Sequence, residues 1–387
     1  MANILTFYGD YDLSNETNTS RTLTITINDF DLKTYLNFRI ILTWISLLVI
    51  LTGLIGNFFS FIILINKKLR ISTNVFLASM CVSAFIALIG LLINSVIYEL
   101  LAYYRALKVL EILYFFYPYF YPLITTFQMV SILLTVCVSV NQFICVYFLK
   151  AKIFSKKANQ KDCKSALVIV LVMFLISILY CVPYWLKFEY IPEVGLSVTE
   201  LGRDPLFNKI VHFWMYIFVC YIIPFSILII TNTYLLSTIM IAKRRRKRLG
   251  MRKTEQGDVE LLDKKLTSIV ERYPVQKCTK SKRSRSNVTL MLIAVVFFFF
   301  ICQFPTLVLH IALVWICSSE FPNCSGSIFY QYSFSISKFL LICNLSFNFV
   351  IYCLFSEKFR HVLKETLNIS NYNKNKDEAT SRRASIL

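Results

Sequence analysis

Charged side chains are scarce in this 387-residue chain. Asp, Glu, Lys and Arg make up 16% of it, whereas soluble domains carry about 25%. Histidine is scarcer still, with three residues, and none of them gathers with Asp, Glu or Cys at the spacing of a metal site or a catalytic pair. These absences exclude an ordinary soluble domain, and we expect no enzymatic activity, no metal and no cofactor.

Apolar residues dominate instead, at 57% of the chain with a mean hydropathy of +0.61. Each long apolar run can cross the ~30 Å hydrocarbon core as a helix, which pairs its own backbone groups. We therefore predict an all-α membrane protein, a seven-transmembrane helix bundle over residues 41–354, with its termini on opposite sides of the membrane. The runs lie near residues 41–65, 75–97, 112–148, 166–186, 210–242, 288–316 and 328–354.

Positive charge is distributed unevenly along the chain. Of the 41 Lys and Arg residues, 32 lie in 66–70, 150–164, 243–287 and 358–387, which are the tail and the loops after the first, third and fifth runs. Loops rich in Lys and Arg stay in the cytosol. We therefore predict an outside N-terminus and a cytosolic C-terminus. The net charge of +19 then reflects topology and attraction to membrane lipid rather than nucleic-acid binding.

Residues 1–40 form a polar, acidic extracellular segment in this scheme. They lack the basic and then apolar pattern of a cleavable signal, so we expect the first span to act as its own insertion signal. Asn15 and Asn18 begin Asn-x-Ser/Thr tripeptides and are candidate glycosylation sites. Most of the 12 cysteines fall inside the apolar runs, but Cys317 and Cys324 share a short outer loop and are candidates for a disulfide.

The third run, 114–148, contains no charged residue, and its polar side chains follow one another at helical spacing. A helix that is apolar except for one polar seam needs lipid on one side and other helices or a wet cavity on the other. We predict that this is the central helix of the bundle. The seam consists of Tyr121, Thr125, Gln128, Thr135, Ser139 and Gln142.

Two other polar residues fall within apolar runs. Asn57 would need partners on neighbouring helices, because an amide is costly in hydrocarbon. Lys338 either pairs with Glu99, with Glu111 or with an acidic or carbonyl group of a ligand, or extends its ammonium to the outer membrane interface.

Pro224 and Pro305 interrupt the fifth and sixth runs, where each is either tolerated or acts as a hinge. Asn344, Asn348 and Tyr352 follow at four-residue steps and predict a polar row that bonds across the bundle. Residues 355–387 begin with interleaved apolar and basic residues, typical of a short amphipathic helix on the inner membrane surface, and end in a tail that we expect to be disordered.

The longest predicted cytoplasmic loop, 243–287, holds 16 Lys and Arg residues. Topology and attraction to lipid explain such a loop, and it also suits a cytosolic partner that docks between the fifth and sixth spans. Ser385 follows two arginines near the end of the chain and is a candidate phosphorylation site.

These features together resemble the rhodopsin-like G-protein-coupled receptors over about residues 41–365. The matching features are Gly56-Asn57 in the first span, the prolines Pro183, Pro224 and Pro305, and NFVIY at 348–352, which is similar to the family's NPxxY motif with phenylalanine for proline. Local strings resemble one subgroup, the invertebrate FMRFamide-type neuropeptide receptors. These strings are YCVPYW at 180–185, CQFP at 302–305 and NFVIYC at 348–353.

The resemblance implies a multi-pass plasma-membrane receptor that binds an extracellular neuropeptide and signals through a heterotrimeric G protein. Its candidate ligand contacts are Tyr121, Thr125, Gln128, Gln303, His310 and Lys338. Its candidate signalling switch consists of Asn57, Asn141, Gln142, Phe143, Pro224, Pro305, Asn344, Asn348 and Tyr352.

The chain departs from that family at positions that matter for signalling. Asn141, Gln142 and Phe143 replace the Asp-Arg-Tyr motif, and Ala84 replaces an aspartate that binds sodium. The family's disulfide to the following outer loop is absent, because Tyr117 replaces one cysteine and that loop contains none. Two alternatives therefore stay open: a chemosensory receptor for small molecules, and a non-coupling decoy or partner receptor.

Overall fold

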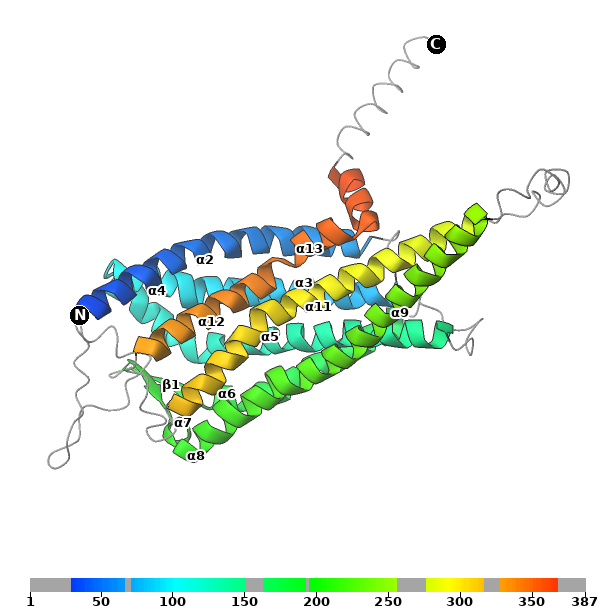
Figure 1. Ribbon diagram of the computed structural model, residues 1–387. Coiled ribbons are helices and arrows are strands. Elements are labelled where there is room, and N and C mark those ends of the chain that lie inside the picture. The colour runs from blue at the N-terminus through cyan, green and yellow to red at the C-terminus, as the bar shows by residue number, and fades with distance from the viewer. Residues whose placement is uncertain are drawn as a thin grey trace, which may run out of the picture.

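The computed structural model describes residues 29–66, 71–150, 163–192, 195–255, 276–316 and 328–367, and in these the chain is a bundle of long helices (Figure 1). The first half contains α2 (Asp29–Leu64), α3 (Ser72–Leu91), the π-helical η3 (Leu92–Ile97), α4 (Tyr98–Tyr103), α5 (Leu107–Lys150) and α6 (Cys163–Trp185). The second half contains β1 (Phe188–Ile191), β2 (Gly195–Val198), α7 (Glu200–Arg203), α8 (Pro205–Phe207), the π-helical η4 (Asn208–Met215) and η5 (Ile217–Ile222), α9 (Ile223–Glu255), α11 (Gln276–Ile316), α12 (Ile328–Ser346) and α13 (Asn348–Phe355).

Six helical segments in the described part of the chain are long and apolar enough to cross a membrane, and the bent pair of α12 and α13 makes a seventh. Their order matches the seven predicted runs, so the prediction of a seven-span bundle is confirmed. The first helix begins at Asp29, before the apolar run that starts at 41. Polar residues therefore form its first turns.

The α5 helix lies in the middle of the bundle and contacts α3, α4, α6, α9 and α11. Its polar seam faces inward, as the sequence predicts: Thr135, Ser139 and Gln142 are buried. The exposed side chains of α5 include the apolar Ile112 and Ile144. The seam therefore meets other helices, and the apolar face is left for lipid.

The last span bends by 44° between α12 and α13, although phenylalanine stands at 349 in place of a proline. A kink of this size needs a cause other than proline. Asn57 of α2 supplies one, because its Nδ2 donates to the carbonyl of Leu345 at 2.9 Å, in the last turn before the break. Gly56 has no Cβ, which lets Phe349 pack directly on α2. Asn57 therefore bonds across the bundle, as we expect for a buried amide.

A two-stranded antiparallel hairpin, β1 with β2, follows α6 and pairs Phe188 with Val198. This hairpin was not predicted from the sequence. Gly195 opens β2 with φ of +91°, a conformation that suits glycine in a tight turn. We call the end of the bundle that carries this hairpin and the start of α2 the hairpin end (Figure 1).

The opposite end of the bundle carries a short helix at 357–367, and we call this end the tail end (Figure 1). This helix is amphipathic, as predicted, because Phe359 and Val362 are buried while Lys358 and Lys364 are exposed. The Arg360 guanidinium donates to the carbonyls of Cys353 and Leu354, both at 2.8 Å, and so caps the end of α13.

Candidate functional site

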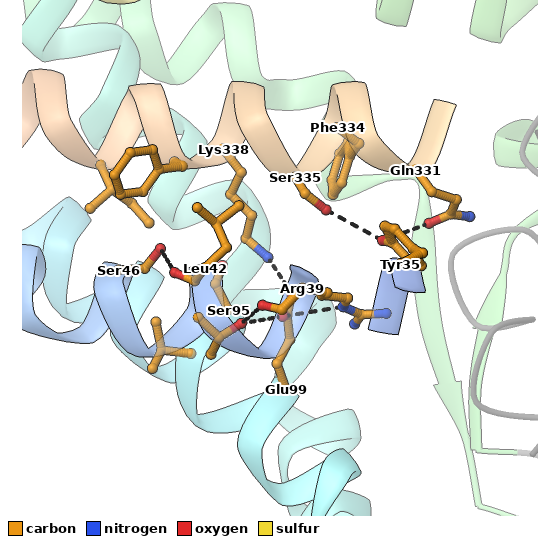
Figure 2. Close-up of a pocket in the computed structure, with 14 residues that line it drawn as sticks. Tyr35, Arg39, Leu42, Ser46, Ser95, Glu99, Gln331, Phe334, Ser335 and Lys338 are labelled. Atoms are coloured by element: carbon orange, nitrogen blue, oxygen red, sulfur yellow. Dashed lines mark hydrogen bonds and ion pairs between the residues drawn. The ribbon is translucent and has the colours of Figure 1, made fainter. Parts of the chain in front are cut away.

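A cavity at the hairpin end lies between α2, the η3–α4 segment and α12 (Figure 2). Its volume is about 40 Å³, measured as the space that the centres of water molecules can occupy. A water needs about 10–15 Å³ on this scale, so the enclosed part holds a few waters or one small chemical group. The lining residues that carry hydrogen-bonding side chains are Tyr35, Arg39, Thr43, Ser46, Ser95, Glu99, Gln331, Ser335 and Lys338.

Glu99 is the centre of an ion-pair network in this cavity. Its Oε2 lies 3.2 Å from Nε of Arg39, and its Oε1 lies 3.3 Å from Nζ of Lys338. The three side chains are only 16–19% exposed, so water screens their charges less than at an open surface. One carboxylate thus joins α2, α4 and α12 through two cations (Figure 2).

One hydroxyl group bonds to this network and another joins two of its helices. Thr43 donates to Glu99 Oε2 at 2.7 Å, and its side chain is 5% exposed. The Tyr35 hydroxyl donates to Gln331 Oε1 at 3.2 Å and lies 3.3 Å from Ser335 Oγ. The Thr43 bond joins α2 to α4, and the Tyr35 contacts join α2 to α12.

Helical spacing explains why these side chains meet. On α2, Tyr35, Arg39 and Thr43 follow at four-residue steps and share one face, and Gln331, Ser335 and Lys338 share a face of α12. From the sequence, Glu99 and Glu111 are both candidate partners of Lys338. The structure pairs it with Glu99, and Glu111 is an exposed residue on α5.

Sequence reasoning missed the polar lining residues other than Lys338 and Glu99, and the charged one among them is Arg39, which the predicted N-terminal segment included. Its four-residue spacing to Tyr35 and Thr43 was the signal that could have placed it on a helix face.

The other candidate ligand residues do not line this cavity. Tyr121 belongs to an aromatic cluster with Tyr117 and Phe188, and the Thr125 hydroxyl donates to the carbonyl of Tyr121 at 2.8 Å. Gln128 is half-buried on α5. Gln303 is 3% exposed, and its Nε2 has no hydrogen-bond partner among the residues that the structure describes. His310 belongs to α11, and its side chain lies outside the described part.

Aromatic rings hold the hairpin against α5. The Tyr117 ring stacks on Tyr121 with centroids 5.5 Å apart, and it meets Phe188 of β1 edge-on at 5.3 Å. Tyr190 of β1 meets Phe115 in the same way at 5.2 Å. Residues 187–208 contain no cysteine, so these ring contacts attach the loop without a covalent bond to α5. We call Tyr117, Tyr121 and Phe188 the aromatic clasp.

The tail end holds a neutral cluster where α5 meets α3. Asn141 and Gln142 both donate to the Thr73 hydroxyl oxygen, at 3.1 and 2.7 Å. Thr73 is fully buried and Gln142 is 3% exposed. Phe143 packs on Tyr234 of α9, with ring centroids 4.9 Å apart. The three residues at 141–143 therefore tie α5 to two neighbouring helices without any charge.

The remaining switch candidates fall in the core and along the last spans. Asn348 and Tyr352 are buried, and Asn344 is half-buried. Pro224 follows the π-helical η5 at the start of α9, whereas Pro305 lies inside a continuous α11. Asn15, Asn18, Cys317, Cys324 and Ser385 lie outside the described residues.

Comparison with known proteins gives two matches. The model of the "7 transmembrane receptor (rhodopsin family)" matches residues 58–352. A protein of Drosophila melanogaster named "FMRFamide receptor" is 26% identical over 329 residues, which cover 80% of this chain and 50% of that protein. The chain thus spans about half the length of this relative.

Proposed function

Because the chain belongs to the rhodopsin family of seven-transmembrane receptors, we propose that it is a plasma-membrane receptor that binds an extracellular peptide and signals through a heterotrimeric G protein. The similarity to a protein named FMRFamide receptor supports a peptide as the ligand. The excess of Lys and Arg in the tail and its neighbouring loops supports a cytosolic tail end and an extracellular hairpin end.

The charged cavity is the observation that carries the proposal. Arg39, Glu99 and Lys338 meet at the end that we assign to the outside, where a ligand arrives. Ionised groups within a membrane bundle are costly and usually serve binding or transport. A ligand that bonds with these groups could change how α2, α4 and α12 contact one another and so shift a conformational equilibrium.

One observation favours a second candidate, a decoy or partner receptor that binds without coupling. Gln142 is buried against Thr73 and cannot supply the fixed charge and five donors of an arginine. The basic residues of 243–287 would still attract lipid or a cytosolic partner. A chemosensory receptor for small molecules remains the third candidate, because the enclosed part of the cavity is small.

The test expresses the full chain in cells and challenges it with a panel of amidated peptides. Binding and G-protein activation are measured on the same samples. Binding with activation supports the proposed receptor, and binding without activation supports the decoy. If no peptide binds and small odorants do, the peptide proposal is wrong.

A double variant tests coupling separately. Asn141→Asp with Gln142→Arg adds a charge pair to α5 without changing the net charge. We expect peptide-stimulated nucleotide exchange on the G protein to rise several-fold relative to the unmodified chain. The single change Asn141→Asp is the control, because it adds charge without the guanidinium. An unchanged rate for the double variant would mean that residues beyond this motif prevent coupling.

A further inference from the structure

The second span changes its helix type just before it reaches the cavity. The α-helix α3 ends at Leu91, the wider π-helical turn η3 follows over Leu92–Ile97, and the α-helix α4 begins at Tyr98. The backbone N–H of Tyr98 donates to the carbonyl of Ile93, five residues back, whereas an α-helix uses the carbonyl four residues back. This turn therefore accommodates one residue more than an α-helical turn.

The extra residue sets the direction of Glu99. Leu91 shares a buried cluster with Ile50 of α2 and Ile342 of α12, and so marks the face of the second span that meets those helices. Each residue of an α-helix advances by about 100° around the axis, so Glu99, eight positions later, would point about 80° away from that face in an uninterrupted α-helix. Because η3 takes up one residue, Glu99 returns to within about 20° of the face.

The contacts of this segment depend on that direction. The Glu99 carboxylate lies 3.2 Å from Nε of Arg39 and 3.3 Å from Nζ of Lys338. The Tyr98 hydroxyl lies 2.9 Å from the Tyr114 hydroxyl of α5. If η3 became an α-helical turn, α4 would rotate by about 100° and all three contacts would break. The form of η3 therefore decides whether the second span is joined to α2 and α12 by these ion pairs.

Little within η3 itself favours the π-helical form. Such turns are rare, and this one contains no proline. The side chain of Asn94 in η3 has a buried Nδ2 with no hydrogen-bond partner among the described residues, and an unpaired buried donor is unfavourable. The helix α4 is six residues long and ends at a turn where Arg105 adopts φ of +58°, which is uncommon for a residue other than glycine. The ion pairs of Glu99 thus favour the π-helical form, and α4 is short enough to rotate as a unit.

We propose that η3 is a register switch that controls the charged cavity. Its π-helical form directs Glu99 to Arg39 and Lys338, and its α-helical form withdraws the carboxylate and separates α4 from α2 and α12. A ligand that displaces Glu99 from either cation favours the α-helical form. The proposal rests on the receptor function above and names the element that moves when the ligand binds.

The first experiment changes the register without a ligand. Deletion of Asn94 leaves seven positions from Leu91 to Glu99, so a plain α-helix directs the carboxylate into the cavity. An alanine inserted after Asn94 turns the carboxylate away. Each purified full-length variant is unfolded thermally in detergent, alone and with Glu99→Gln, Lys338→Gln or both, and the double-mutant cycle gives the coupling between the two side chains.

We expect this coupling to persist in the deletion variant and to disappear in the insertion variant. The deletion variant should unfold at a temperature no lower than that of the unmodified chain, because it loses the π-helical turn and the unpaired amide together. Asn94→Ala is the control, since it removes the amide, keeps the register and should keep the coupling. Loss of the coupling in the deletion variant, or failure of this variant to fold, would overturn the proposal. The deletion decides the matter if the insertion variant does not fold.

The second experiment tests whether a ligand moves the turn. Amide hydrogen exchange of residues 92–99 is measured in the unmodified chain and in the deletion variant, each with and without a panel peptide that binds. We expect the peptide to slow this exchange several-fold in the unmodified chain, because regular α-helical hydrogen bonds form, and to leave the deletion variant unchanged.

The outcomes separate the switch from the receptor function. A peptide that binds without changing the exchange of η3 overturns the switch and leaves the receptor function intact. If no panel peptide binds, the receptor function is wrong and the ligand-driven switch is wrong with it. The coupling measured in the first experiment then still shows whether η3 sets the register of Glu99.

Discussion

At both ends of the bundle, polar side chains join neighbouring helices, but the two ends use different chemistry. At the hairpin end, α2, α4 and α12 are joined through the ionised Arg39, Glu99 and Lys338. At the tail end, α5 is joined to α3 through the neutral amides of Asn141 and Gln142 on Thr73. Both ends satisfy polar groups across helices, with ionised side chains at one end and neutral amides at the other. Helix association in this interior therefore does not require charge.

Removal of the central carboxylate tests this comparison most severely. Glu99→Gln removes the carboxylate that Arg39 and Lys338 share, so we expect a loss of about 3 kcal/mol in the free energy of unfolding. Thermal unfolding in detergent measures it. The matched control is Glu111→Gln, which removes an exposed carboxylate on α5. Equal unfolding temperatures for the two variants would show that the ion pairs contribute nothing to the fold.

The neutral cluster should show a smaller effect with a different salt dependence. Thr73→Val keeps the shape of the side chain but removes the acceptor of both amides, for a loss of about 2 kcal/mol. Thr52→Val, on an exposed face of α2, is the control. High salt should reduce the effect of Glu99→Gln and leave that of Thr73→Val unchanged, because salt screens charge. Matching salt dependences would remove the distinction between the two ends.

The aromatic clasp gives a third, still weaker contribution at the hairpin end. Tyr117→Leu removes its ring contacts with Tyr121 and Phe188, which together stabilise the loop by about 1 kcal/mol. Hydrogen exchange of the amides at 188–198 should therefore become faster. The control Tyr119→Leu removes an exposed ring two residues along the chain and should leave this exchange unchanged. Unaltered exchange in Tyr117→Leu would mean that other contacts hold the hairpin.

An effect as small as that of the clasp concerns Lys187, just beyond the end of α6. Burial lowers the pKa of this lysine from 10.5 to about 8. Between these values the unfolded chain binds more protons than the folded chain, so stability should rise with pH, by about 1 kcal/mol after allowance for partial exposure.

Unfolding temperatures measured between about pH 7 and pH 10.5 check this. Lys187→Met should be more stable near pH 7 and should lose that part of the slope. A slope identical to that of the unmodified chain would contradict the prediction.

Hydropathy was enough to predict the spans and the direction in which α5 faces. Those features depend on local periodicity, such as the spacing that places Thr135, Ser139 and Gln142 on one buried face. In the predicted row of Asn344, Asn348 and Tyr352, the last two are buried and Asn344 is half-buried, and the bonds across the bundle that we expect for this row stay a prediction.

Pairings between distant segments were not predictable in the same way. Thr73 offers no sign in the sequence that it accepts from two amides nearly 70 positions away. Arg39 lies outside the apolar run because helices extend beyond hydrocarbon, where hydropathy no longer reports them. The hairpin at 188–198 is too short for an alternating pattern to distinguish it from a loop.

The bend in the last span has a consequence for how its shape is maintained. A proline at 349 would lack its N–H permanently, whereas Phe349 keeps this donor and so the possibility of a straight helix. The angle is thus held from outside by Asn57 on the first span. If the first span slid along the seventh, this hydrogen bond would weaken. The bend angle of the last span therefore depends on the position of the first span.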